Sequence, residues 1–205
     1  MLQLDHIAIS GPTLDDATAY VEQALGVALQ PGGQHARFGT HNTLLGLEDG
    51  LYLEAIAVDP AAAMPDRPRW FDLDRMTGPP ALTNWICRTE DMAAALAALG
   101  PDAGQPVALS RGALRWQMAV PPDGRLPYDN RFPALIQWQC AQHPAAMLAP
   151  SGVRLRRLVV AHPRAAELRD QLAPLLTEAR VVYEPAAQTA MLAEFDTPHG
   201  MRVLQ

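Results

Sequence analysis

Short apolar and alternating runs recur along this chain in a fixed order. Residues 4–9 form an apolar run typical of a strand, and residues 14–25 carry apolar positions at the spacing of an amphipathic helix. Thr13 is a suitable N-cap for that helix and Gly26 a suitable stop. Further strand-like segments follow at 28–30, 40–47 and 51–58, the last two joined by a turn that contains Asp49-Gly50. The pattern predicts a module of one strand, one helix and three strands (βαβββ).

The same order recurs twice more. The second copy has a strand at 82–87, a helix at 92–99 and strands at 107–110, 114–120 and 134–140. The third has a strand at 154–160, a helix from Pro163 toward Leu176 that Pro174 should kink or end, and strands at 180–183, 191–195 and 201–204. We therefore expect paired modules over 1–143 (module one 1–60, a proline-rich connector 61–79, module two 80–143) and a third module over 152–205.

Composition narrows the class of protein. The 205 residues are 49% hydrophobic, enough for a sizeable core, and no apolar run approaches a membrane span. The net charge is −6, which argues against a nucleic-acid partner. No secretory signal precedes the first strand, so we expect a cytoplasmic protein without membrane partners. All 16 basic residues are Arg, which excludes lysine Schiff-base chemistry.

The cysteines and the common catalytic motifs point to no redox or nucleotide chemistry. Cys87 and Cys140 lie far apart, each in a strand-like run, and are expected to be reduced. No zinc-ribbon spacing, nucleophile elbow, dinucleotide fingerprint or phosphate loop is present.

Several segments resemble the vicinal oxygen chelate proteins, the superfamily of glyoxalase I and extradiol dioxygenases, and in particular its glyoxalase-like domains. The segments are Leu4-Asp5-His6-Ile7-Ala8-Ile9, Gly32-Gly33-Gln34-His35, Gly39-Thr40-His41-Asn42, Tyr52-Leu53-Glu54-Ala55-Ile56, Ser110-Arg111 with Trp116, and Pro133-Ala134-Leu135-Ile136-Gln137-Trp138. The resemblance implies an α+β fold in which βαβββ modules pair into a curled mixed sheet, with a cleft inside and helices outside. Because this fold serves many chemistries, it implies no single reaction.

The resemblance also implies a divalent metal held by the first and fourth strands of each module. His6 and Glu54 are the candidate ligands from module one, and this donor pair suits Zn, Ni, Mn or Fe. In module two, Asn84 and Gln137 fall where the other two ligands would be, so the site is incomplete. Either the metal is lost, or His35 or His41 completes the set.

Other residues are candidates for substrate binding. Glu54 is also the candidate catalytic residue, because a carboxylate inside an apolar strand needs a metal, an Arg or other donors. Arg111 could bind a substrate carboxylate in a bidentate manner, or lie exposed on the surface. We expect six substrate-binding residues in all: His41, Asn84, Trp85, Arg111, Trp116 and Gln137. The histidines at 143, 162 and 199 are expected on the surface.

Two functional hypotheses stay open. The first is a metal-dependent lyase, isomerase or dioxygenase that acts on vicinal oxygens of a small substrate. The second is a metal-free protein that binds or sequesters a small molecule without catalysis. Because two modules close one cleft, the third leaves a sheet face or edge to be covered, so we expect a homodimer or a third module that packs back on the first two.

Overall fold

The computed structural model describes all 205 residues as three successive strand–helix–three-strand units. The first unit contains β1 (Leu2–Ser10), α1 (Leu14–Leu25), β2 (Gln30–His35), β3 (Thr40–Gly46), η1 (Glu48–Gly50) and β4 (Tyr52–Val58), and η2 (Trp70–Arg75) follows it. The second contains β5 (Ala81–Thr89), α2 (Met92–Leu99), η3 (Pro101–Ala103), β6 (Gln105–Arg111), β7 (Leu114–Val120), α3 (Pro127–Asn130) and β8 (Ala134–Trp138), and α4 (Pro144–Met147) follows. The third contains β9 (Arg154–His162), α5 (Ala165–Leu172), β10 (Val181–Pro185), β11 (Ala190–Thr197) and β12 (Gly200–Leu204).

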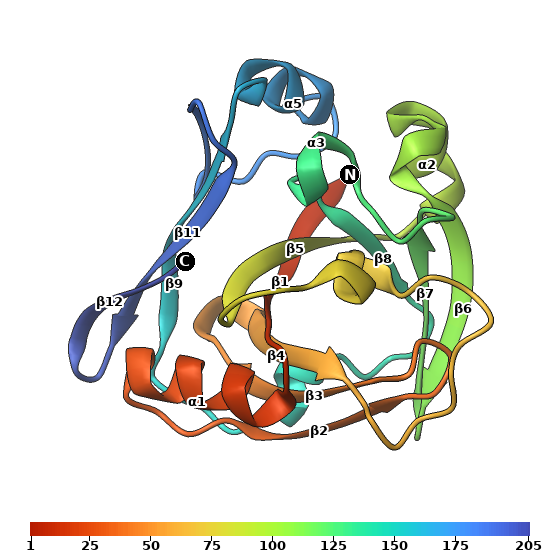
Figure 1. Ribbon diagram of the computed structural model, residues 1–205. Helices are drawn as coiled ribbons and strands as arrows, with labels where there is room; N and C mark the ends of the chain where they lie inside the picture. Colours follow the sequence, from red (N-terminus) through yellow and green to blue (C-terminus); the bar gives the residue numbers. More distant parts are fainter.

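The first two units share one curled, eight-stranded mixed sheet in the order β2-β3-β4-β1-β5-β8-β7-β6. Within each unit the first strand runs parallel to the fourth, and β1 and β5 join the units in antiparallel register. The curl brings the two edge strands β2 and β6 close to each other (Figure 1). The structure therefore confirms the predicted α+β fold with a curled mixed sheet.

The third unit forms a separate four-stranded sheet, β10-β9-β11-β12, that packs against the outside of the large sheet (Figure 1). Contacts between α1 and β12 and between β11 and β5 join the two layers. The C-terminus is held by backbone and side-chain hydrogen bonds, from Leu82 N and Tyr20 Oη to the Gln205 carbonyl. Of the two alternatives for the third unit, the structure shows the one that packs back.

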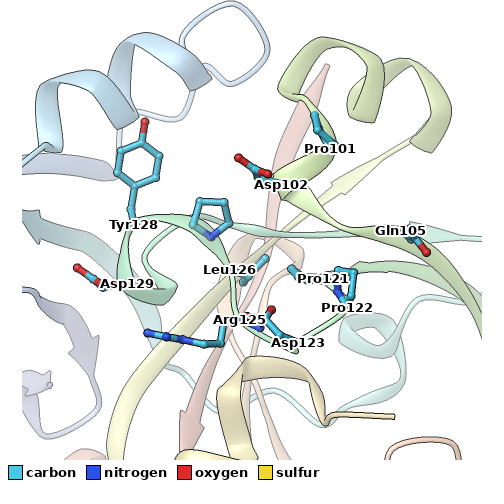
Figure 2. Close-up of a pocket in the computed structure, with 11 residues that line it drawn as sticks. Pro101, Asp102, Gln105, Pro121, Pro122, Asp123, Arg125, Leu126, Tyr128 and Asp129 are labelled. Carbon is cyan, nitrogen blue, oxygen red and sulfur yellow. Dashed lines mark hydrogen bonds between the residues drawn. The ribbon is translucent and has the colours of Figure 1, made fainter. Parts of the chain in front are cut away.

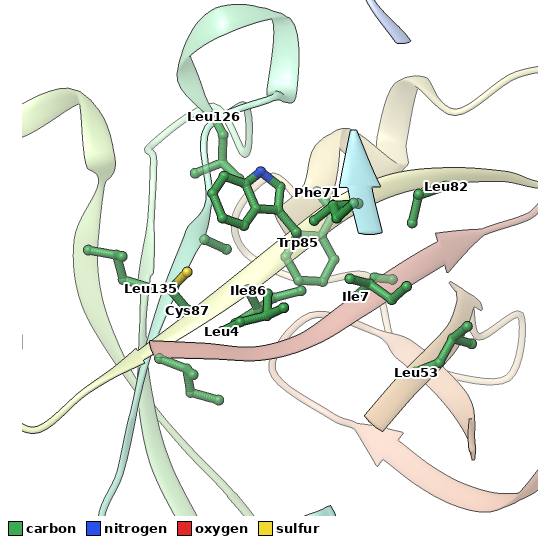
Figure 3. Close-up of a cluster of buried hydrophobic side chains, with 14 of the residues drawn as sticks. Leu4, Ile7, Leu53, Phe71, Leu82, Trp85, Ile86, Cys87, Leu126 and Leu135 are labelled. Carbon is green, nitrogen blue, oxygen red and sulfur yellow. The ribbon is translucent and has the colours of Figure 1, made fainter. Parts of the chain in front are cut away.

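One hydrophobic core runs through both layers. The fully buried Trp85 on β5 belongs to this core together with Leu4 and Ile7 on β1 (Figure 3). The same cluster continues into the third unit, where Phe195 and Leu204 are also fully buried. The large sheet is therefore covered by apolar side chains on its convex face as well as inside its curl.

The helices are short and capped as the sequence predicts. The Thr13 side chain accepts a hydrogen bond from Asp16 N at the start of α1, and Gly26 ends this helix with a φ of 73°. In the turn between β3 and β4, Asp49 and Gly50 both have positive φ, as a tight hairpin requires. No helix has the length and apolar character needed to cross a membrane.

Two segments differ from the prediction, and the loop between β7 and β8 contains an unusual turn. The strand expected at 28–30 is β2 at Gln30–His35. Its Pro and Gly residues are unfavourable for a strand, but pairing with β3 holds the segment in an extended conformation. The helix expected from Pro163 toward Leu176 is α5, which ends at Leu172, two residues before Pro174. The loop at 121–132 contains a left-handed turn, with positive φ at Tyr128, Asp129 and Asn130.

Candidate functional site

The concave side of the large sheet encloses a small cavity that receives side chains from both units. Its free volume is about 30 Å³, which is the size of a water molecule or an ion. Thirteen residues line it: His6, His35, Asn42, Leu44, Tyr52, Glu54, Trp70, Phe71, Arg111, Trp116, Met118, Ile136 and Trp138. Because Glu54 and His6 are both nearly fully buried here, this cavity is the candidate site.

The predicted pair of His6 and Glu54 meets at the floor of the cavity. His6 on β1 lies opposite Tyr52 on the parallel strand β4, so that Glu54, two residues further, faces the same side. His6 Nε2 is 3.7 Å from Glu54 Oε2, and the imidazole stacks on Tyr52 with ring centroids 4.2 Å apart. The separation is too long for a direct hydrogen bond, but both atoms can contact one ligand atom between them.

A buried carboxylate, Asp5, holds His6 from behind. His6 Nδ1 lies 2.7 Å from Asp5 Oδ1, and Trp138 Nε1 and His143 Nε2 lie 3.1 and 2.9 Å from Asp5 Oδ2. Burial by itself would raise the pKa of Asp5, but the hydrogen bonds from His143 and His6 outweigh burial and hold that pKa below its ordinary value. The ionised Asp5 therefore receives the Nδ1 proton of His6 and leaves Nε2 facing the cavity.

The Asn42 side chain connects Glu54 to the guanidinium of Arg111. Asn42 Nδ2 donates to Glu54 Oε1 at 2.5 Å, and Asn42 Oδ1 accepts from Arg111 Nη1 at 3.1 Å and from Gly33 N at 2.8 Å. Arg111 reaches this point from β6, across the gap between the two edge strands. It forms no ion pair with an acidic side chain, and its Nε and Nη2 make no hydrogen bond with the protein.

His35 completes the polar side of the cavity as a neutral imidazole. Burial lowers its pKa to about 4, and the nearby Arg111 acts in the same direction, against the opposing effect of Glu54. Arg111 Nη1 lies 3.3 Å from His35 Nε2, and Nδ1 lies 3.1 Å from Thr40 Oγ1. Because arginine can only donate, Nε2 is the acceptor and Nδ1 carries the proton toward Thr40.

The second unit supplies an apolar wall. Met118 on β7 and Ile136 on β8 line the cavity on the side of the second unit. Trp116 and Trp138 extend this wall with ring centroids 5.6 Å apart. The cavity is polar on one side and apolar on the other.

Four of the predicted site residues, His6, Glu54, Arg111 and Trp116, line the cavity together. The other four lie outside it. Gln137 is turned toward α2, where its Oε1 accepts from Met92 N at 2.9 Å. Trp85 donates to the Arg131 carbonyl at 2.8 Å and faces Tyr183 of the third unit.

The remaining two are His41 and Asn84. His41 alternates with Asn42 on β3, so its side chain is on the opposite face of the sheet from the cavity, and its Nε2 is buried without a hydrogen-bond partner. Asn84 is fully buried on β5, and its Oδ1 accepts from Asn130 Nδ2 at 3.4 Å.

Sequence reasoning missed Asp5, Trp70 and His143 as residues of the site. The ladder between β1 and β5 shifts register between Leu4 and His6, so Asp5 and His6 can share one side, against strict alternation. His143 is not a free surface residue, since it contacts Asp5. The expectation of a surface position is wrong for His162 too, which is 4% exposed beside Tyr128.

The donor atoms do not fit a resident divalent metal. No three His, Cys, Asp or Glu side chains converge in the chain, and His6 with Glu54 provides two ligands where protein metal sites use three or four. Asn42 already occupies one oxygen of Glu54. Asn84 and Gln137, at the positions expected for the other two ligands, are bonded elsewhere, and apart from Arg111 the second unit lines the cavity with apolar and aromatic side chains.

A larger hollow of about 590 Å³ lies on another face of the molecule, between η3 and the loop after β7 (Figure 2). Its wall carries Asp102, Asp123 and Asp129 beside Arg125, and it includes none of the predicted site residues. Arg125 is already paired with Asp72 at 3.3 Å. All four of these charged residues are exposed, so this hollow is a weaker candidate than the cavity around the buried Glu54.

Known proteins with a similar sequence or structure have a fold of the same kind. The sequence matches the family described as Glyoxalase-like domain over residues 4–176. A hypothetical protein from Staphylococcus aureus has a similar structure, with a TM-score of 0.60, 16% identity, and coverage of 93% of this chain and 88% of that one. Methylmalonyl-CoA epimerase from Mycobacterium tuberculosis is a weaker match, with a TM-score of 0.44, 21% identity, and coverage of 70% and 91%.

No curated protein matches the sequence significantly. At these identities the structural likeness shows the fold alone, and the family match, which spans most of the chain, shows the membership. The chain therefore belongs to the glyoxalase-like domain family, as its resemblance to vicinal oxygen chelate proteins predicted.

Proposed function

We propose that this protein binds a small organic anion between Arg111, His6 and Glu54, and that Glu54 exchanges a proton with a carbon of the bound molecule. One observation carries this proposal. A buried carboxylate and a guanidinium without an acidic partner are held in the same cavity, joined through a single amide, Asn42. A cation of this kind attracts an anion, and the carboxylate beside it can act as a base.

Arg111 and Glu54 have different roles in this proposal. Arg111 binds the carboxylate of the ligand through the donors that the protein leaves free. Glu54 takes a proton from the carbon next to that carboxylate or next to an adjoining carbonyl, and the electron pair moves onto the carbonyl oxygen. Returning the proton to the other face of the carbon, or to a neighbouring atom, gives an isomerase. Loss of a group from the next carbon gives a lyase.

The apolar wall supports these roles. Trp116 and Ile136 keep water from the side of the cavity opposite Glu54, which strengthens the electrostatic effect of Arg111 on a developing negative charge. Asp5 holds His6, and Asn42 holds Glu54 and Arg111, so both act as positioning residues. A dioxygenase requires a redox metal on three or more ligands, so this donor set favours the isomerase or lyase reading.

A protein that binds the anion without catalysis is the second candidate. The three tryptophans at 70, 116 and 138 suit contact with a bound ligand as well as they suit chemistry. In that case Glu54 would orient the ligand by hydrogen bonding and would transfer no proton. Cytoplasmic location stays a prediction under both candidates.

The test uses pyruvate and 2-oxobutanoate, which carry a carboxylate next to an activated carbon. Binding is measured by calorimetry, and exchange of the carbon-bound hydrogen for deuterium is followed by NMR in heavy water. We expect binding by the wild type that falls at least about tenfold in Arg111→Gln, because a charge-assisted contact is lost. Glu54→Gln should retain binding and lose the exchange.

Arg202→Gln, on β12 and remote from the cavity, is the matched control and should behave as wild type. Binding that depends on Arg111, with no exchange above the buffer rate for either acid, would favour the non-catalytic candidate. If Arg111→Gln binds the acids as well as the wild type does, or if neither acid binds, the proposal is wrong.

Metal titration tests separately whether His6 and Glu54 bind a divalent metal. The purified, stripped chain is titrated with nickel, zinc, manganese and iron(II). We expect no stoichiometric binding at micromolar metal, because only His6 and Glu54 converge. Stoichiometric binding that is abolished in both His6→Ala and Glu54→Ala would restore the metal-dependent hypothesis.

A further inference from the structure

The cavity around Glu54 is too small to hold the whole of an organic ligand. Its free volume of about 30 Å³ accommodates one or two atoms, whereas small-molecule sites usually measure several hundred Å³. The rest of a ligand must therefore occupy a hollow that opens onto this cavity. Of the hollows that share residues with it, two contain residues of both edge strands, β2 and β6, and Arg111 lies across the gap between these strands.

The first hollow, of about 390 Å³, shares Arg111 and Leu44 with the cavity. Leu114, Pro144, Met147 and Leu148 form its apolar wall, and the backbone of β2 at Gly32 and Gly33 forms another side. Arg111 is the one charged residue among those that line it. We call this the α4 hollow, because Pro144 and Met147 are the ends of α4.

The second hollow, of about 440 Å³, shares His35 and Trp116 with the cavity. Arg37, Ser110, Arg115 and Gln139 make its wall polar. An apolar group placed there would leave these polar groups without water, which costs free energy. The two hollows thus differ in the kind of ligand body that they can accept.

The surface of the α4 hollow is apolar and open. Met147 is 58% exposed, and Leu148 beside it is half-buried, so covering them would remove apolar area from water. Few other large apolar side chains of the chain are exposed to this extent. A cation at one end and an uncovered apolar wall along the rest match a molecule with an anionic head and an apolar body.

We propose that the ligand is an amphipathic monocarboxylate, whose carboxylate binds Arg111 and whose alkyl chain lies in the α4 hollow over Leu114, Met147 and Leu148. The inference rests on the proposed function, which assigns Arg111 to the ligand anion, and it adds the chemical class of the rest of the molecule. The head then lies next to Asn42 and Glu54, and the chain points out of the cavity.

The experiment is a chain-length series measured by calorimetry: acetate, butanoate, hexanoate, octanoate and decanoate, all below their micelle concentrations. We expect the Kd to fall about fourfold for each added methylene until the hollow is filled. This factor corresponds to the free energy of transferring one CH₂ group out of water. Octan-1-amine has the same chain and the opposite charge. It should bind far more weakly than octanoate, because its ammonium group would be repelled by the Arg111 guanidinium.

The variant Met147→Asp should flatten the series, because it replaces an apolar side chain in the wall of the hollow by a charged one. Met147 is largely exposed, so this change should not disturb folding. Met201→Asp is the matched control, because Met201 is 56% exposed on β12, on the third unit. It should leave the slope as in the wild type.

The outcomes separate the two proposals. A flat series with Arg111-dependent binding of the short acids would overturn the amphipathic ligand and leave the proposed function in place. A normal slope that Met147→Asp does not change would overturn the α4 hollow as the chain's location. If Arg111→Gln binds every acid as the wild type does, or if octan-1-amine binds as tightly as octanoate, both proposals fail.

Discussion

At the scale of single residues, the cavity depends on two neighbours that strict strand alternation would separate. Asp5 and His6 are consecutive, yet their side chains hydrogen-bond, because the β1–β5 ladder is irregular at this point. Asp5 is fully buried and accepts from His143 and Trp138 as well as from His6. Breaking a buried ionic network of this kind usually costs several kcal/mol, so the irregularity also contributes to stability.

His35 is a second residue whose environment has a measurable consequence. Its pKa is about 4 in the folded protein, against 6.5 for an unperturbed histidine, because it is buried next to Arg111. As the pH falls, the unfolded chain binds this proton first. The free energy of unfolding therefore decreases from about pH 6.5 to about pH 4 and gains nothing further from His35 below that pH.

We predict that this pH dependence is lost in His35→Gln, which keeps polar atoms and does not titrate. The free energy of unfolding in urea is measured at several pH values from 7.5 to 4. The wild type should lose on the order of 3 kcal/mol more than the variant over this range. The exposed His199 provides the control variant His199→Gln. Parallel curves for wild type and His35→Gln would show that His35 is not held neutral.

At the scale of elements, the edge strand β2 decides whether Arg111 can reach the cavity. A Cβ on Gly33 would lie 2.7 Å from Arg111 Cδ, and one on Gly32 would lie 2.0 Å from Asn42 Oδ1. The two glycines therefore leave the space in which Asn42 and Arg111 meet. This explains a strand made of Gln30-Pro31-Gly32-Gly33-Gln34-His35, whose composition is poor for a sheet.

We predict that Gly33→Ala displaces the flexible Arg111 side chain and leaves the fold intact. Loss of the contacts to His35 and Asn42 should weaken binding of octanoate about tenfold or more, with little change in the free energy of unfolding. The double variant Gly33→Ala with Arg111→Gln should bind no more weakly than Arg111→Gln alone. Additive losses would mean that Gly33 acts on the ligand by another route.

The caps of the first helix and the turn before β4 follow local sequence signals. Caps at Thr13 and Gly26 and the turn at Asp49-Gly50 are where the sequence predicts them, because these signals depend on a few neighbouring residues. The bounds predicted for strand β2 are wrong, because this strand depends on its pairing with β3. Such a contact between two elements cannot be inferred from local composition.

At the scale of the whole molecule, the third unit covers the convex face of the large sheet. Phe195 and Leu204 are fully buried in the same cluster as Trp85, and Leu2 N donates to the Leu175 carbonyl. The division into paired modules at 1–143 and a third module at 152–205 stays a prediction, because a shared core does not say whether the parts fold alone. The homodimer also stays a prediction, testable by sedimentation.

We predict that a chain without residues 152–205 does not form the native cavity, because Trp85 and its neighbours would face water. The truncated chain is examined by near-ultraviolet circular dichroism and gel filtration. Phe195→Ala in the full chain provides a milder test. It should lower the free energy of unfolding by about 3–5 kcal/mol within a single transition. A monodisperse truncated monomer with native aromatic signals, or a separate transition in Phe195→Ala, would show that the third unit is independent.

Local patterns in the sequence predict the order of elements, their caps and the family, because periodicity and short motifs are properties of neighbouring residues. The predicted residues His6, Glu54 and Arg111 line one cavity, but their surroundings depend on contacts between distant segments. The irregular ladder that joins Asp5 to His6, the amide of Asn42 between Glu54 and Arg111, and the apolar wall from unit two all result from strand pairing. Register is set by contacts between distant segments, and a shift of one residue exchanges the faces of a strand.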